Sequence, residues 1–248
     1  MKIPVALELY SVRDETQKDF IGALEKVAGI GYKGVEFAGF GDIPAARLRK
    51  ALAGLGLEAA GSHTDIRPLT DELDEVIEYN QALGNHYIVC PCMTFESKED
   101  IARTSELFNK IGEKIRAGGL EFLYHNHAHE FKRFDGEYGL DLLFKGVEPE
   151  NMGAEVDTGW AFYAGADPAG YIGKYKGRCP LIHVKDFTSA KDGNFTEIGA
   201  GAVNVRAIAA AAAETGVRWI IVEQDESSMP SLESVGVSFA NLRKMDLV

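Results

Sequence analysis

Short apolar segments alternate with longer amphipathic segments along the whole chain. The short segments have the length and the Val, Ile and Leu content of buried strands, whereas the longer ones repeat apolar residues with the period of a helix. In the segment DFIGALEKVAGI, for example, Leu24 and Val27 fall on one face of the expected helix. The predicted strands are Val5–Leu9, Gly34–Phe37, Leu57–Ser62, His86–Pro91, Leu120–Asn126, Gly153–Thr158, Leu181–Lys185 and Trp219–Gln224.

Helical patterns fill the intervals between these strands. Several end at a glycine, as in GLGLEAAG and ETGVRWIIVE, because glycine adopts the left-handed conformation that ends a helix before the next strand begins. The predicted helices are Asp19–Ile30, Ile43–Leu55, Thr70–Leu83, Lys98–Ala117, Pro168–Tyr175, Val203–Thr215 and Pro230–Met245, with a weaker one at Gly139–Val147.

Eight strands, each followed by a helix, predict a closed (β/α)8 TIM barrel that spans residues 1–248 as a single domain. An open, doubly wound sheet is the alternative, because periodicity does not show whether a sheet closes. The chain has no GxGxxG sequence after its first strand, which weakens a dinucleotide-binding reading of such a sheet.

The charge balance and the cysteines narrow the classes of partner. The chain has 26 Lys and Arg residues against 38 Asp and Glu residues, a formal charge of −12, so we expect no nucleic-acid partner. Cys90, Cys92 and Cys179 have no CxxC spacing, which argues against a disulfide framework and a structural zinc site. No apolar run approaches the roughly 20 residues that span a bilayer, and the first residues lack a signal-peptide pattern. We therefore expect a cytoplasmic protein with no membrane partner, and a homo-oligomer is compatible with the sequence.

Ionisable residues collect where the predicted strands end, which in a TIM barrel is where the active site forms. They share faces as well: Glu155 and Asp157 are two residues apart on one strand, and so are His183 and Lys185 on the next. Unpaired carboxylates inside a barrel are costly, so a divalent cation is the expected partner. Mixed oxygen and imidazole donors suit Mn²⁺, Co²⁺, Zn²⁺ or Fe²⁺ better than Ca²⁺. The residues are Glu8, Arg13, Glu36, His63, His125, His127, Glu155, Asp157, His183, Lys185, Glu223 and Asp225.

An ordered set of motifs extends this pattern over essentially the whole chain. The motifs are LELYSVRDE, GYKGVEFAG, GSHT, YHNHAHEF, EVDTGW, LIHVKD and IIVEQD. Together they resemble the xylose isomerase-like TIM barrels, also described as sugar phosphate isomerases/epimerases. The resemblance implies one divalent metal ion (Mn, Co, Zn, Fe or Mg) near the barrel axis and a carbohydrate substrate.

The resemblance also implies a ligand set of Glu, Asp, His and Glu from four successive strands. Asp157, His183 and Glu223 match the last three ligands, but His125 stands where the first Glu is expected. Glu130 follows a few residues later, and we predict it as the fourth metal ligand, with His125 as the substitute. Losing one carboxylate weakens symmetrical two-base epimerisation, so inosose dehydratases and lyases of 3-keto sugars stay open as models.

The implied function is a metal-dependent sugar isomerase or epimerase that removes a proton next to a carbonyl; a dehydratase or lyase using the same metal site is the alternative. An abasic-site endonuclease and a non-catalytic sugar-binding barrel are further alternatives. The loop Thr188–Gly201 is expected to cover the site, and Asp186 to cap that loop. The predicted catalytic residues are His63, His127, Glu130 and Glu223, and the predicted substrate-binding residues are Arg13, Glu36, His125, Trp160 and Lys185.

Overall fold

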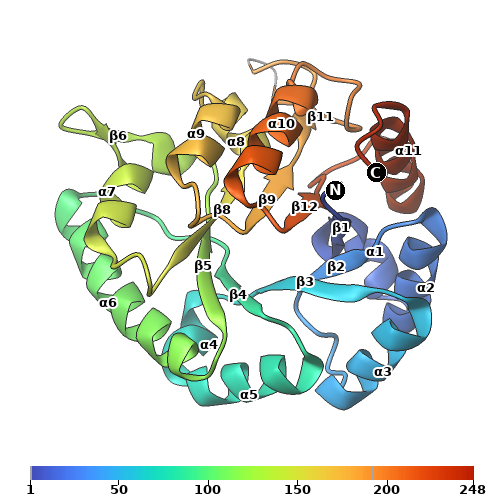
Figure 1. Ribbon diagram of the computed structural model, residues 1–248, viewed down its shortest axis with the longest axis horizontal. Coiled ribbons are helices and arrows are strands. Elements are labelled where there is room, and N and C mark those ends of the chain that lie inside the picture. The colour runs from blue at the N-terminus through green and yellow to red at the C-terminus, as the bar shows by residue number, and fades with distance from the viewer. Residues whose placement is uncertain (1, 191–192) are drawn as a thin grey trace.

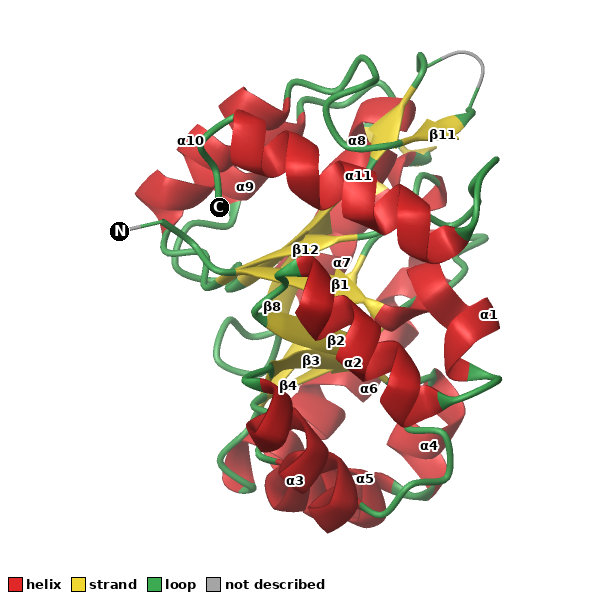
Figure 2. Cartoon of the chain, turned by 90° about the vertical axis from the view of Figure 1, so that its right-hand side faces the viewer, coloured by secondary structure: helices red, strands yellow, loops and turns green. Residues whose placement is uncertain are grey.

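Eight parallel strands form the centre of the molecule in a computed structural model that describes residues 2–190 and 193–248. They close into a barrel in the order β1-β12-β9-β8-β5-β4-β3-β2, with the helices arranged around them (Figures 1 and 2). The closed order confirms the predicted (β/α)8 barrel and excludes the open sheet. The barrel strands are β1 (Val5–Glu8), β2 (Gly34–Ala38), β3 (Glu58–His63), β4 (Tyr87–Cys90), β5 (Glu121–His125), β8 (Gly153–Asp157), β9 (Leu181–Val184) and β12 (Trp219–Val222).

The main predicted helices are present, with their ends shifted by a few residues. The helix predicted at Thr70–Leu83 corresponds to α5, and its first two residues belong to a separate, unpredicted helix, α4, which begins at Ile66. The backbone of Glu72 leaves the helical region and separates the two. The α-helices are α1 (Arg13–Thr16), α2 (Phe20–Ile30), α3 (Ala45–Leu55), α4 (Ile66–Asp71), α5 (Leu73–Leu83), α6 (Lys98–Ala117), α7 (Gly139–Gly146), α8 (Thr158–Tyr163), α9 (Pro168–Lys174), α10 (Val205–Thr215) and α11 (Ser231–Lys244).

Short elements that the periodicity does not predict lie on the connections. Two 3-10 turns, η1 (Leu9–Val12) and η2 (His129–Phe131), follow β1 and β5. Two small antiparallel hairpins also form, one from β6 (Arg133–Phe134) and β7 (Glu137–Tyr138), the other from β10 (Asp186–Phe187) and β11 (Phe195–Thr196). These elements have two to four residues, too few to show a period, so the sequence pattern does not reveal them.

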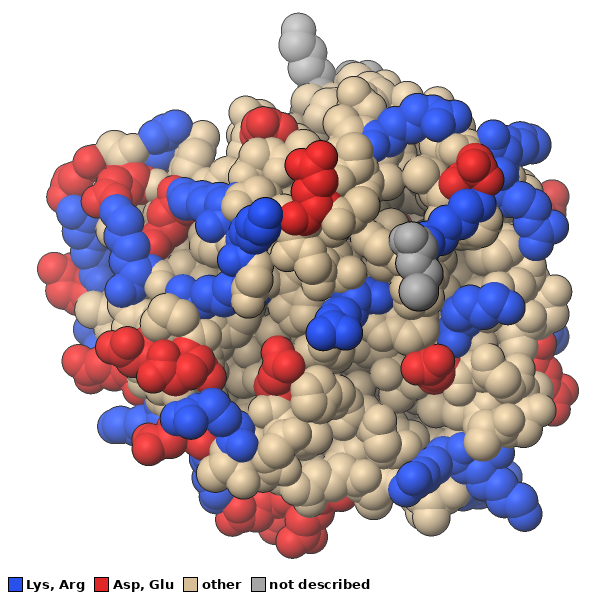
Figure 3. Space-filling model, in the orientation of Figure 1, with Lys and Arg blue, Asp and Glu red and all other residues tan. Residues whose placement is uncertain are grey.

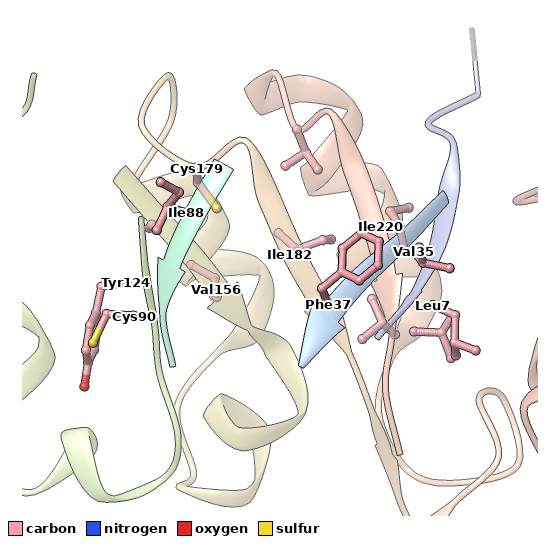
Figure 4. Packing of buried hydrophobic residues seen from close by; sticks show 14 of the residues in the cluster. Leu7, Val35, Phe37, Ile88, Cys90, Tyr124, Val156, Cys179, Ile182 and Ile220 are labelled. Atoms are coloured by element: carbon pink, nitrogen blue, oxygen red, sulfur yellow. The ribbon is translucent and has the colours of Figure 1, made fainter. Parts of the chain in front are cut away.

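Alternate residues along each strand face the helices or the lumen. Leu7, Phe37 and Ile182, seen in Figure 4, belong to the large outer cluster between strands and helices. The residues between them point into the barrel and form a second, separate apolar cluster. That inner cluster contains Ala6, Ala60, Val89, Leu123, Leu181, Trp219 and Ile221.

The surface carries mixed charge. On the face in Figure 3, basic and acidic side chains are interspersed, in a chain whose formal charge is −12. Among the described residues, no helix is long and apolar enough to cross a membrane.

Candidate metal centre and active site

The residues that follow the inner apolar cluster on the same strand face are ionisable. Glu8 lies two residues beyond Ala6, and Glu223 two residues beyond Ile221. The strand register sets them side by side, since Asp157 pairs with His183 and His125 with Glu155. All of them are buried: Glu8, Glu36, His125, Glu155, Asp157, His183 and Glu223.

A bulge in the sheet makes room for one of these carboxylates. The register between β2 and β3 shifts at Val35 and Glu36, so Glu36 pairs with Gly61. A Cβ at Gly61 would collide with Oε1 of Glu36. Glycine is therefore required at position 61 if the Glu36 carboxylate is to lie inside the barrel.

Four buried side chains have the geometry of a metal site. The donor atoms of His125, Asp157, His183 and Glu223 all lie within 4.8 Å of one another. Nδ1 of His183 is 2.6 Å from Oε2 of Glu223, and Oδ2 of Asp157 has no hydrogen-bond partner although the residue is fully buried. A buried carboxylate oxygen that accepts no hydrogen bond and lies among imidazoles suits a divalent transition metal, so the donors present fit such an ion.

Glu155 connects His63 to this group. Its Oε2 lies 3.0 Å from Nδ1 of His125, 2.8 Å from Nε2 of His63 and 3.2 Å from Nε2 of His183. Two further sets of clustered donors overlap the first, one of His63, His125, Glu155 and His183, the other of Glu8, Glu36, His63 and His183. Glu155 was identifiable in the sequence because it shares a strand face with Asp157, but the predicted ligand set leaves it out.

A buried ammonium borders the same carboxylates. Nζ of Lys185 lies 2.8 Å from Oδ1 of Asp225, 2.9 Å from Oε2 of Glu223 and 3.4 Å from Oδ2 of Asp157. These acids raise the pKa of Lys185 against the effect of burial. With a dication on Glu223 and Asp157, the lysine would still have Asp225, its closest partner.

The histidines divide into two classes. Burial, with Lys185 next, lowers the pKa of His127 to about 3, and burial with His183 holds the pKa of His125 well below its ordinary value. Burial also opposes charge on His63, but Glu36 and Glu155 outweigh it and raise its pKa to about 10. Without a bound cation, the neutral imidazoles of His125 and His127 therefore lie close to the protonated imidazole of His63 at this end of the barrel.

The structure does not bring Glu130 into the metal group, contrary to its predicted place as fourth ligand. The buried carboxylate accepts hydrogen bonds from the Tyr124 hydroxyl at 2.7 Å and from the backbone N–H of His127 at 2.9 Å. Both oxygens are thus engaged in holding the turn after β5. His125, the substitute, takes the position next to Asp157, because it is the last lumen-facing residue of its strand.

A cavity of about 800 Å³ opens beside the cluster. His63, His125, His127 and Glu223 line it at the barrel end. The remaining lining residues come from the loops after β1, β2, β3, β4 and β12 and from α4 and α5; they are Tyr10, Ala38, Gly39, Phe40, Thr64, Asp65, Pro68, Glu75, Val76, Tyr79, Asn80, Pro91, Cys92 and Asp225.

Four of the predicted substrate-binding residues do not line this cavity. Glu36 is fully buried, with Oε2 2.5 Å from Nε2 of His183, so it supports a histidine instead of facing the cavity. Lys185 is enclosed by its three acids, and Arg13 stacks on the Tyr10 ring at 4.1 Å. Trp160 packs against His127 at 5.7 Å between ring centroids.

The predicted cover of the site, Thr188–Gly201, is described except for residues 191 and 192, which lie outside the described part of the chain. Asp186 holds its far end, since Oδ2 accepts hydrogen bonds from the N–H groups of Gly199 at 2.9 Å and Gly201 at 3.0 Å. This agrees with the capping role expected for Asp186. Phe187 and Phe195 of the hairpin pack on the Trp160 ring, with centroids 5.5 and 5.6 Å away.

Residues 24–245 match the family model described as xylose isomerase-like TIM barrel. The chain belongs to the xylose isomerase-like TIM barrel family. It is similar to an inosose dehydratase from Lacticaseibacillus casei, 28% identical over 134 residues, which are 47% of this chain and 44% of that protein. The matched segment thus spans less than half of that relative.

Solved structures extend the likeness over the full barrel. A sugar phosphate isomerase/epimerase from Parabacteroides distasonis superposes with a TM-score of 0.86 at 24% identity, covering 100% of this chain and 98% of that one. The IolI protein, whose crystal structure contains a bound zinc atom, superposes with a TM-score of 0.75 at 16% identity, covering 100% and 98% of the two chains. At these identities the structures show the shared fold.

Proposed function

We propose that this chain is a metal-dependent enzyme of the isomerase or epimerase type, which removes a proton next to the carbonyl of a sugar or keto-sugar. The observation that carries the proposal is the buried group of His125, Asp157, His183 and Glu223, whose donor atoms lie within 4.8 Å of one another beside the cavity. A dication held there would polarise a substrate carbonyl as a Lewis acid.

The protein side of the reaction falls to the residues between the metal group and the cavity. Glu223 belongs to both, so its carboxylate can take a proton from a carbon bound next to it. His127 lines the cavity, and burial with Lys185 lowers the pKa of its imidazole to about 3. Its neutral ring can therefore accept a hydrogen bond, or a proton, from a substrate hydroxyl. Glu130 supports this role by fixing the His127 backbone.

Elimination of water, by a dehydratase or lyase, is the second candidate. His63 lines the cavity, and Glu155 holds its Nε2 at 2.8 Å. After proton removal next to the carbonyl, the adjacent C–O bond would break and His63 would protonate the departing hydroxyl. The similarity to inosose dehydratases supports this candidate. An endonuclease is less well supported, because no Lys or Arg occurs among the described residues that line the cavity.

Metal content and proton exchange test the proposal together. We expect close to one divalent ion per purified chain, and deuterium uptake from D₂O into a keto-sugar or keto-cyclitol substrate. Glu223→Gln should lower the exchange rate by about 10²–10⁴-fold, because it removes both a ligand and a base. Mass spectrometry of the recovered sugar separates exchange, epimerisation and loss of water.

Glu130→Gln is the matched control, since it alters a buried carboxylate that lies outside the metal group. It should retain the metal, whereas Glu223→Gln should lose most of it. Metal loss in Glu130→Gln alone would restore Glu130 as a ligand. Thermal stabilisation by sugars without exchange or product, across a broad panel, would instead indicate a binding protein.

A further inference from the structure

The cavity beside the candidate site continues well past the ionisable residues. Its barrel end is formed by His63, His125, His127 and Glu223, whereas the part that lies against α4 and α5 is formed largely by apolar side chains. We propose that this second part, the apolar arm, binds a flat apolar substituent on an unphosphorylated sugar; the inference rests on the proposed sugar chemistry. The apolar lining of the arm consists of Ala38, Phe40, Pro68, Val76, Tyr79 and Pro91, and Glu75 and Asn80 of α5 also line the cavity there.

An aromatic pair forms the wall of the apolar arm. The rings of Phe40 and Tyr79 lie 4.2 Å apart between centroids at 30° to each other, and both side chains are half-buried. The Tyr79 hydroxyl donates a hydrogen bond to the backbone carbonyl of Ile43 at 2.5 Å, so its polar end is already satisfied. The wall is therefore fixed before binding and presents aromatic carbon to the cavity, which suits an aromatic or similarly flat group.

The charges around the cavity argue against a phosphorylated substrate. Its lining includes the carboxylates of Asp65, Glu75, Glu223 and Asp225, and none of the described lining residues is Lys or Arg. Guanidinium and ammonium groups are the usual side-chain partners of a phosphate dianion, and the buried ammonium of Lys185 is already paired with three acids. The His63 imidazole, which also lines the cavity, is already paired with Glu155 at 2.8 Å. A neutral substituent avoids this repulsion.

The size of the cavity points the same way. About 800 Å³ lies towards the upper end of the 300–1,000 Å³ typical of pockets that enclose drug-sized ligands. A single sugar ring would fill the polar end and leave the aromatic wall exposed to water. A glycoside with an aryl group places its sugar beside Glu223 and its ring against Phe40.

Calorimetry with inert glycosides tests the apolar arm without any turnover. Phenyl and methyl β-glucosides lack a carbonyl, so their binding to the metal-loaded enzyme reports affinity alone. We expect the phenyl compound to bind about tenfold more tightly or better. Phe40→Ala should reduce that ratio to roughly threefold or less, and Val76→Phe, which fills the arm, should weaken the phenyl compound while sparing the methyl one.

Equal affinity for the two glycosides, no binding of either, or an unchanged ratio in both variants would overturn the proposal. Tighter binding of methyl glucoside 6-phosphate than of methyl glucoside would overturn the part of the proposal that excludes a phosphorylated sugar. The chemistry is judged separately: proton exchange without a phenyl preference leaves the proposed function standing and removes the arm. A preference for the phenyl glucoside without bound metal or proton exchange would support the apolar arm and contradict the proposed function.

Discussion

The lumen of the barrel contains two layers with opposite chemistry on the same strands. The lower layer is apolar, with Leu123 and Ile221 fully buried, and the upper layer begins two residues later with His125 and Glu223. Strand alternation fixes the position of both layers equally. The two layers lie only two residues apart on the same strand face. One backbone pattern therefore positions both a stabilising apolar core and a group of buried ionisable side chains.

The two layers have opposite energetic consequences. Burying the apolar layer contributes about 25 cal/mol for each Å² removed from water. Three carboxylates of the upper layer oppose folding, because they lose their hydration on burial, which raises the pKa of Glu8, Glu36 and Asp157. Glu155 and Glu223 differ, because burial is outweighed by neighbouring histidines and, for Glu223, by Lys185, which lower their pKa. Removing one of the three uncompensated charges should therefore change stability with the opposite sign to a truncation in the lower layer.

The largest stability effect is expected in the lower layer. Leu123→Ala removes a fully buried side chain from the inner cluster, so it should lower the free energy of unfolding by about 2–5 kcal/mol. Chemical denaturation gives this value, and metal content per folded chain should stay unchanged. A loss of metal with little loss of stability would contradict the separation of the layers.

The upper layer should show a smaller effect of opposite sign. Oε2 of Glu8 is buried without a hydrogen-bond partner, while Oε1 accepts the N–H of Tyr10 at 2.9 Å. Glu8→Gln keeps that acceptor and removes the charge, so the metal-free protein should gain on the order of 1 kcal/mol. Melting with and without chelator measures the gain. Destabilisation comparable to that of Leu123→Ala would show that the carboxylate itself supports the fold.

The smallest effect concerns a histidine outside both layers. The contact of Cys92 with His129, together with Glu130, raises the pKa of His129 to about 9 against the effect of burial. An unfolded histidine titrates near 6.5, so between the two values the folded protein holds the extra proton. The stabilisation that protonated His129 adds to the folded state is fully present below about pH 6.5 and is lost as pH rises through about 9. Denaturation at several pH values should show a shallower decline in His129→Gln than in the parent chain.

The sequence was sufficient for the barrel and for the convergence of Asp157, His183 and Glu223, because each lies at a strand end where period and parity fix its direction. It was insufficient for Glu130, which follows the strand in a turn. Nothing in the spacing YHNHAHEF shows that the Tyr124 hydroxyl holds that carboxylate away from the metal group.

The sequence also did not predict the cavity. Its apolar arm brings Phe40 from the loop after β2 against Val76 and Tyr79 on α5. These residues read as ordinary amphipathic-helix and loop positions, because their neighbours in space come from another βα unit. The helix boundary was a further difficulty, because the predicted helix runs through Glu72, where the structure ends α4 and begins α5.

Gly61 makes two distant positions in the chain dependent on each other. Any side chain at 61 would have to expel the Glu36 carboxylate, which in turn contacts His183. A mutational scan should therefore find position 61 intolerant although it touches neither metal nor sugar. Larger residues at position 61 should be tolerated only when Glu36 is replaced by a shorter residue as well. The absence of a side chain at Gly61 therefore determines whether residue 36 can be a glutamate.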